Sequence, residues 1–127
     1  MRSMAAIAGA VLILGMVVSA PAEDLTVRLP GVAVTQIHAS FACGAEGVAM
    51  GLPAGPFTVE YLNAGENHLA VLPVHGQALI FTNVISGSGA RYAAGRYIWW
   101  DAGARGVTLS VEGDGHQQAN CHLVKKQ

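Results

Sequence analysis

The chain has 127 residues, a formal net charge of −1, and 12% charged residues against 52% hydrophobic ones. This length fits one domain after an N-terminal leader is set aside. The charge balance excludes the basic footprint that nucleic-acid binding requires, and it favours a cationic partner only weakly.

The N-terminal segment has the order of an export signal. A basic residue at the start is followed by an uncharged run from Ala5 to Val18, shorter than the about 20 residues of a membrane span. Ala20 and Ala22 then form a small-residue cleavage site. We predict a signal peptide over residues 1–22, a mature start at Glu23, and a periplasmic or secreted protein without stable membrane insertion. The alternative is an uncleaved N-terminal anchor.

Several later segments alternate between apolar and polar residues, as half-buried strands do. These segments are Leu25–Leu29, Phe57–Tyr61 and Val107–Val111. Leu69–Leu72 and Ala78–Phe81 are apolar on both faces, which predicts more deeply buried strands, with Gly76 turning the chain between them.

Turn residues separate these runs at the spacing of about 8–12 residues that is typical of an all-β sandwich or barrel. A small antiparallel barrel of about eight strands is favoured because closure leaves no unpaired edge. No segment carries a clear helical stripe. We assign residues 23–40 to an N-terminal extension or an added strand, and residues 41–127 to the barrel domain.

Two cysteines are present, Cys43 and Cys121. An even number of cysteines in an exported chain favours one disulfide, and this one would close most of the domain. The alternative is a pair of metal-binding or redox thiols, for which there is no Cys-x-x-Cys spacing.

The segment Ser86–Tyr92 contains a Ser-Gly-Ser-Gly run that cannot pack a core. It predicts an exposed loop, held between strands around 81–85 and 96–100, and functional residues concentrate in such loops. The other interpretation is a plain flexible hairpin tip. Trp99 and Trp100 follow in the second of these strands and should face opposite sides, with one in the core and the other exposed.

Motifs for chemistry are missing from the sequence. The five histidines have no metal-ligand spacing, and there is no Gly-x-Ser-x-Gly elbow or dinucleotide fingerprint. We therefore expect no cofactor, no metal and no catalytic activity. The histidines are His38, His68, His75, His116 and His122.

Taken together, these features resemble the membrane-bound and periplasmic inhibitors of c-type lysozyme. The similarity runs from about Phe41 to Leu123. Its elements are Phe41-x-Cys43, the strand Phe57–Asn63 with Asn63-Ala64-Gly65, the Ser86–Tyr92 loop, Trp99-Trp100 with Gly103, and Cys121.

The resemblance implies an eight-stranded barrel with its two cysteines bridged and a partner that is a c-type lysozyme. The loop serine, here Ser88, would enter the lysozyme cleft and hydrogen-bond the catalytic carboxylates. Arg91 is expected to brace the loop backbone and Tyr92 to pack at the barrel rim. The lysozyme-binding set is then Ser86, Gly87, Ser88, Gly89, Ala90, Arg91, Tyr92 and Ala102.

One departure from the family pattern concerns the residues after the tryptophan pair. Ala102 occupies the place of a family lysine, and Asp101 adds a charge of the wrong sign toward the lysozyme carboxylates. Arg96 or Arg105 could supply the missing cation if they point the same way. The alternative function is an envelope binding or structural barrel of the same family that has lost tight inhibition. The oligomeric state stays open.

Overall fold

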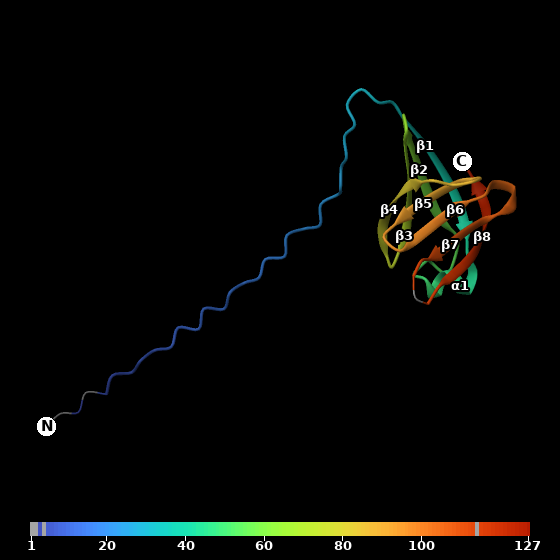
Figure 1. Ribbon diagram of the computed structural model, residues 1–127. Coiled ribbons are helices and arrows are strands. Elements are labelled where there is room, and N and C mark those ends of the chain that lie inside the picture. Colours follow the sequence, from blue (N-terminus) through green and yellow to red (C-terminus); the bar gives the residue numbers. More distant parts are fainter. Residues whose placement is uncertain (1–2, 4, 114) are drawn as a thin grey trace.

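The computed structural model describes residues 3, 5–113 and 115–127. Ahead of Val34, the described residues carry no helix or strand and run as an extended, exposed arm away from the rest of the molecule (Figure 1). Across all the residues that the structure describes, no helix is both long enough and apolar enough to cross a membrane.

Eight strands form a closed antiparallel barrel, in which each strand pairs with the next and β8 returns to pair with β1 (Figure 1). This confirms the predicted fold class. The strands are β1 (Val34–Ala42), β2 (Phe57–Ala64), β3 (Asn67–Val74), β4 (Gln77–Val84), β5 (Ala90–Ala94), β6 (Tyr97–Asp101), β7 (Val107–Val111) and β8 (Gln117–Lys126).

The core fills the barrel interior with the apolar side of each strand. Phe57, Val59 and Tyr61 of β2 are buried, as the alternation predicted. The prediction of strands buried on both faces is wrong, because Ile80 of β4 is 39% exposed while its neighbour Phe81 is fully buried. A closed barrel has one interior, so the second apolar face of such a strand meets solvent.

The strand expected at Leu25–Leu29 is not formed. Leu25 and Val27 are exposed, and the first strand begins at Val34, which lies within the segment 23–40. A strand needs a hydrogen-bonding edge, and the closed barrel offers none to this segment. Its alternation therefore finds no partner within the barrel.

The disulfide joins Cys43 and Cys121, whose Cα atoms lie 4.1 Å apart. Both residues are buried members of the core. Cys43 follows β1, and Cys121 lies in β8, so the bond spans the seam where the first and last strands meet. The predicted disulfide is confirmed.

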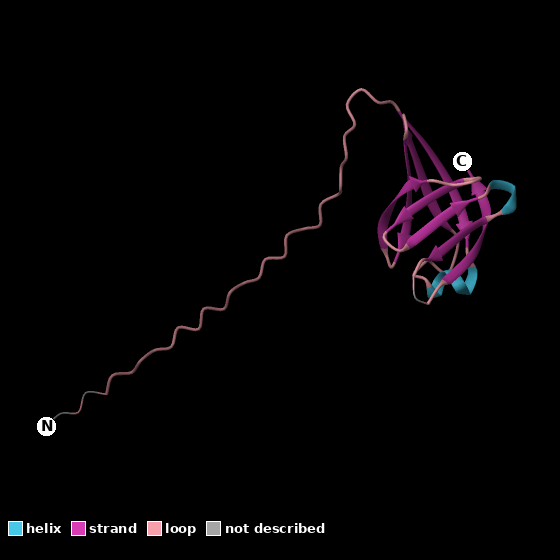
Figure 2. Ribbon diagram, in the orientation of Figure 1, coloured by secondary structure: helices cyan, strands magenta, loops and turns pink. Residues whose placement is uncertain are grey.

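A short helix, α1 (Gly44–Ala49), follows Cys43 and was not anticipated, since six residues are too few for a helical stripe. The chain after it buries Met50 and Leu52 in the core. This segment therefore closes the barrel end at which β1 finishes. Figure 2 shows α1 there, and a second short helix, η1 (Gly103–Arg105), at the opposite end.

Candidate functional site

The connection between β4 and β5 and the connection between β6 and β7 lie at one end of the barrel. Neighbouring strands are antiparallel, so β4 and β6 finish at the same end, away from α1. We call this the loop end. At this end the predicted loop lies beside residues 102–106, which follow it in the sequence by ten or more positions.

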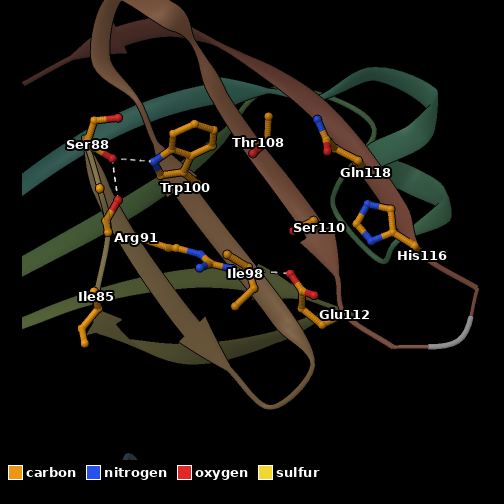
Figure 3. Close-up of a pocket in the computed structure, with 12 residues that line it drawn as sticks. Ile85, Ser88, Arg91, Ile98, Trp100, Thr108, Ser110, Glu112, His116 and Gln118 are labelled. Carbon is orange, nitrogen blue, oxygen red and sulfur yellow. Dashed lines mark hydrogen bonds and ion pairs between the residues drawn. The ribbon is translucent and has the colours of Figure 1, made fainter.

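Ser88 is held at the loop end by its main-chain oxygen. The indole N–H of Trp100 donates a 2.9 Å hydrogen bond to this oxygen, and the Ser86 hydroxyl donates a second one of 2.5 Å. Figure 3 shows Trp100 reaching the loop from the neighbouring strand. Two donors on one carbonyl fix the loop tip, so Ser88 is presented on a held backbone and not on a free hairpin tip.

Arg105 contacts the same serine through its side chain. Its guanidinium donates a 2.5 Å hydrogen bond to Ser88 Oγ, and its central carbon lies 5.6 Å from the centre of the Trp100 ring. A hydroxyl that accepts one bond still has its own proton to donate. The exposed Ser88 hydroxyl is thus a donor with a cation beside it.

A tight turn places Arg105 there. The Ala102 N–H donates to Gly106 O at 2.9 Å, and the Gly106 N–H donates to Gly103 O at 3.0 Å. Gly103 and Gly106 both have positive φ values, which glycine adopts without strain. The turn folds the arginine back toward the preceding loop.

The two loop glycines have different roles. Gly89 has a φ of +68°, and a Cβ there would lie 2.5 Å from the Asp101 carbonyl oxygen. A Cβ at Gly87 would meet nothing within 4 Å. Only Gly89 is therefore required by the close approach of the loop to β6, while Gly87 faces open space.

Ala90, Arg91 and Tyr92 open strand β5 and do not belong to the free loop. Arg91 reaches Glu112, with 3.5 Å between its nitrogen and the carboxylate oxygen, and it is Trp100 and Ser86 that hold the loop backbone. Tyr92 is 6% exposed and packs against Tyr61 inside the barrel. These two residues therefore support the loop from β5 and are not its tip.

A surface groove of about 460 Å³ begins at the loop and crosses the outer face of β6, β7 and β8 (Figure 3). Trp100 and Ile98 form its apolar part, and Thr108, Ser110 and Gln118 supply polar groups. The groove extends the loop into a larger, mixed surface on the same side of the barrel.

The tryptophan pair divides as the alternation predicted. Trp99 is fully buried, and its indole N–H donates to the Tyr61 hydroxyl at 2.8 Å. Trp100 is half-buried and faces the groove. Asp101 follows Trp100 and faces the opposite side of the strand. Its carboxylate accepts hydrogen bonds from the Tyr61 hydroxyl at 3.2 Å and from the Gly103 N–H at 3.0 Å.

This geometry corrects the expected direction of the Asp101 charge. Its carboxylate turns toward Tyr61 and lines a cavity at the barrel mouth, while the groove side of the strand carries Trp100. The inward position follows from strand alternation, because Asp101 is two residues from the buried Trp99. The carboxylate therefore faces the barrel mouth, whereas Trp100 bonds the Ser88 carbonyl from the groove side of β6.

The tyrosines at the barrel mouth predict an alkaline loss of stability. Burial raises the pKa of Tyr61 well above its usual value near 10, against a lowering by the Trp99 hydrogen bond. Burial and the Asp101 charge raise the pKa of Tyr92. Both phenols stay neutral in the fold. Their contribution to the free energy of unfolding is complete below about pH 10 and is lost as the pH rises through the folded pKa of each group, at no more than about 1.4 kcal/mol per pH unit.

Thermal unfolding followed between pH 8 and pH 12 measures this effect. Tyr92→Phe should flatten the fall of Tm, and Tyr61→Phe should flatten it further, although Tyr61→Phe also lowers Tm at neutral pH by removing two hydrogen bonds. If the fall of Tm with pH is the same in the wild type and both variants, the two tyrosines do not cause the alkaline loss of stability.

His116 lines the groove, and two other histidines bond residues outside the loop. A ring nitrogen of His68 lies 2.7 Å from the Asn63 amide oxygen, and one of His75 lies 3.1 Å from the Tyr97 hydroxyl. Over the described ranges, no group of three or more His, Cys, Asp or Glu side chains is placed to hold a metal ion. The site at the loop end is accordingly built from a hydroxyl, an indole and a guanidinium.

Comparison with known proteins assigns the family. Residues 53–118, just over half of the chain, match the family model described as membrane-bound lysozyme-inhibitor of c-type lysozyme. The chain belongs to this family. The matched range contains the whole Ser86–Tyr92 loop, both tryptophans and Arg105, so the membership rests on the part of the chain that forms the loop end.

Two curated relatives carry the name membrane-bound lysozyme inhibitor of C-type lysozyme. The Pseudomonas aeruginosa protein is 65% identical over 48 residues, which is 37% of this chain and 38% of that protein. The Cupriavidus necator protein is 37% identical over 67 residues, 50% of this chain and 54% of that protein. The matched segments thus span between about a third and a half of these relatives.

A solved structure extends the likeness over most of the barrel. It is the crystal structure of Pseudomonas aeruginosa MliC in complex with hen egg white lysozyme, with a TM-score of 0.60 and 39% identity. The match covers 82% of this chain and 99% of that one. The inhibitor family and this chain therefore share the barrel as well as the sequence around the loop.

Proposed function

We propose that this protein inhibits a c-type lysozyme by placing the exposed tip of the Ser86–Tyr92 loop, residues 86–89, in the active-site cleft of the enzyme. The observation that carries the proposal is Ser88, whose backbone is clamped by Trp100 while its hydroxyl stays exposed. Membership of the inhibitor family and the likeness to an inhibitor in complex with hen egg white lysozyme support it. The protein acts by binding and performs no catalysis itself.

The chemistry of the loop suits the target. Glycosidases of the lysozyme type work with a pair of carboxyl groups. The Ser88 hydroxyl can donate to an ionised carboxylate, and it can accept from a protonated one. Because the loop is already held in place, binding loses less conformational entropy than it would for a free hairpin.

Arg105 supplies the cation of the site. Ala102 stands where the family carries a lysine, but the guanidinium of Arg105 reaches Ser88 Oγ from the same turn. A guanidinium has five N–H donors in a planar fork and matches a carboxylate bidentately. Arg105 thereby takes over the role of the missing lysine and presents its charge beside the serine.

The place of action follows from the N-terminal segment. Residues 1–22 act as an export signal, cleaved before Glu23, and the barrel works in the periplasm or outside the cell, where the disulfide persists. There the inhibitor protects peptidoglycan from lysozyme. The name of the two curated relatives, membrane-bound lysozyme inhibitor, supports an envelope location.

Ser88→Ala tests the serine directly. It removes one hydrogen bond to a charged group, worth about 1.5–3 kcal/mol, so inhibition should weaken about ten- to a hundredfold. Folding should be unaffected because the hydroxyl is exposed. The measurement is the inhibition constant against a c-type lysozyme, with Thr58→Ala, an exposed hydroxyl deletion at the other end of the barrel, as the matched control.

Two comparisons complete this experiment. Ser86→Ala removes only the second donor to the Ser88 carbonyl, so its effect should be smaller than that of Ser88→Ala. Equal inhibition by the wild type and Ser88→Ala would refute the serine mechanism. A wild type that does not inhibit, but gains inhibition with Ala102→Lys, would favour the second candidate, an envelope binding module whose lysozyme site has decayed; Ala102 itself is the observation behind that candidate.

A further inference from the structure

A cavity of about 320 Å³ opens at the mouth of the barrel, at the loop end. The opposite end is closed by the buried residues after α1, so the interior is reached from this side. Its apolar wall comes from the first and last strands, with Ile37, Phe41 and Leu123. The volume lies in the range of small-ligand pockets, and barrel mouths are among their preferred places.

Asp101 brings one carboxylate to this cavity. A carboxylate has about four acceptor positions, and the Tyr61 hydroxyl and the Gly103 N–H occupy two of them. The same two bonds fix the orientation of the group. Asp101 is half-buried, so its remaining positions favour a positively charged donor that enters from the mouth.

Three aromatic residues line the cavity: Phe41, Tyr61 and Tyr92. The Tyr61 and Tyr92 ring centres are 5.7 Å apart. The electron-rich faces of aromatic rings attract organic cations, and rings grouped around an anion are a recurring recognition site for ammonium groups. The wall thus suits a cation that also carries hydrocarbon.

We propose that the barrel mouth binds an organic ammonium with an apolar stem, its head at Asp101 among Tyr61 and Tyr92 and its stem along Ile37, Phe41 and Leu123. The ligand is a free amine or the lysine side chain of a bound partner, which share this chemistry. The proposal does not depend on lysozyme inhibition. The mouth nevertheless adjoins the loop, because Gly89 packs against the Asp101 backbone.

Lys126 lines the same cavity and carries a charge that opposes a cationic ligand. It is exposed and lies at the last position of β8. Long basic side chains at such rims keep their charged heads in water and contribute only their stems to the wall. Lys126 therefore weakens the binding of an ammonium without occupying its place.

The first test is calorimetric titration of the purified protein with hexylammonium, 1-hexanol and hexanoate, which share one stem and differ in head charge. Hexylammonium should bind saturably, at least about tenfold tighter than 1-hexanol, and hexanoate should not bind. On addition of hexylammonium, NMR chemical-shift changes should appear at Ile37, Tyr92 and Leu123. Absence of saturable hexylammonium binding, equal affinity for 1-hexanol, or shifts at another place would each overturn the proposal.

Variants then test the assigned charges. Asp101→Asn keeps the side-chain shape and should weaken hexylammonium about ten- to a hundredfold, whereas Lys126→Ala should strengthen it. Lys125→Ala removes the same charge one position earlier and should strengthen it less. Unchanged affinity in Asp101→Asn, with its unfolding temperature preserved, would contradict the site.

A lysozyme inhibition assay with added hexylammonium identifies the source of the ammonium. If a lysine of the lysozyme occupies the mouth, hexylammonium should relieve inhibition, and Asp101→Asn should weaken inhibition. If the ligand is a free amine, the inhibition constant changes neither on adding hexylammonium to the wild type nor in Asp101→Asn, while hexylammonium still binds the wild type. Failure of the barrel to inhibit lysozyme leaves the calorimetric result intact, so the two proposals can fail separately.

Discussion

Arg105→Glu should weaken lysozyme inhibition about a hundred- to ten-thousandfold. The change removes the cation that touches Ser88 Oγ and, in the proposed complex, puts a carboxylate before the catalytic carboxyl pair of the enzyme. Like charges brought together across an interface cost several kcal/mol, at about 1.4 kcal/mol per factor of ten. The measurement is the inhibition constant at low and at physiological salt, and the loss should be larger at low salt.

Arg96→Glu is the matched control. It makes the same change of net charge in the turn between β5 and β6, at the end of the barrel away from the loop, and inhibition should stay within about threefold of the wild type, as at a distant exposed site. Inhibition that survives in Arg105→Glu would remove the arginine from the binding site.

A rescue separates the charge of Arg105 from any structural role. Arg105→Ala should weaken inhibition about ten- to a hundredfold, and Ala102→Lys added to it should restore most of the loss. Ala102 lies against the position of a Cβ at Gly89, so a lysine there extends from the same rim of the barrel. A double variant no better than Arg105→Ala would show that the turn itself, and not its charge, is what matters.

Replacing Cys43 and Cys121 together with alanine should lower the free energy of unfolding by about 4–5 kcal/mol. The chain-entropy relation gives this value for a closed loop that contains most of the barrel, in which the cysteines are 78 positions apart. The bond crosses the β1–β8 seam, the pairing with the greatest sequence separation. A loss of this size is a large part of the stability of a small domain.

Denaturant unfolding measures this loss, and the wild type with its disulfide reduced is the natural comparison. Both should have the same midpoint, because both free the same seam. A change below about 1 kcal/mol in the double variant would show that strand pairing alone closes the barrel and that the bond adds little. A large loss in the alanine variant but not on reduction would instead trace the effect to packing around the buried cysteines.

Local pattern was a good guide where the answer depended on one strand at a time. Alternation in Phe57–Tyr61 and Val107–Val111 indicated which side chains enter the core. Adjacency indicated that one residue of the Trp99-Trp100 pair lies inside and the other outside, and the structure puts Trp99 inside. Alternation in Leu25–Leu29 misled, because a strand also needs a free edge, and only the closed topology reveals that none is left.

The direction of individual charges was beyond the sequence. Asp101 was expected to face the partner and instead bonds Tyr61 inside the mouth, and Arg91 was expected to brace the loop but reaches Glu112. The position of Arg105 could be inferred in part. In an antiparallel barrel every second strand finishes at the same end, so the connection after β6 lies at the same end as the connection after β4. Contact with Ser88 needs, in addition, the turn closed by Gly103 and Gly106.

By itself, the sequence determined that this protein is all-β with an exposed Ser-Gly-Ser-Gly loop, and it favoured one disulfide, because strand period, turn residues and cysteine number are read along the chain. Only the tertiary structure decided that Arg105 and Trp100 meet at Ser88 and that Asp101 turns inward toward the mouth. Those contacts join residues from different strands, and their geometry depends on how the barrel closes, which no single segment encodes.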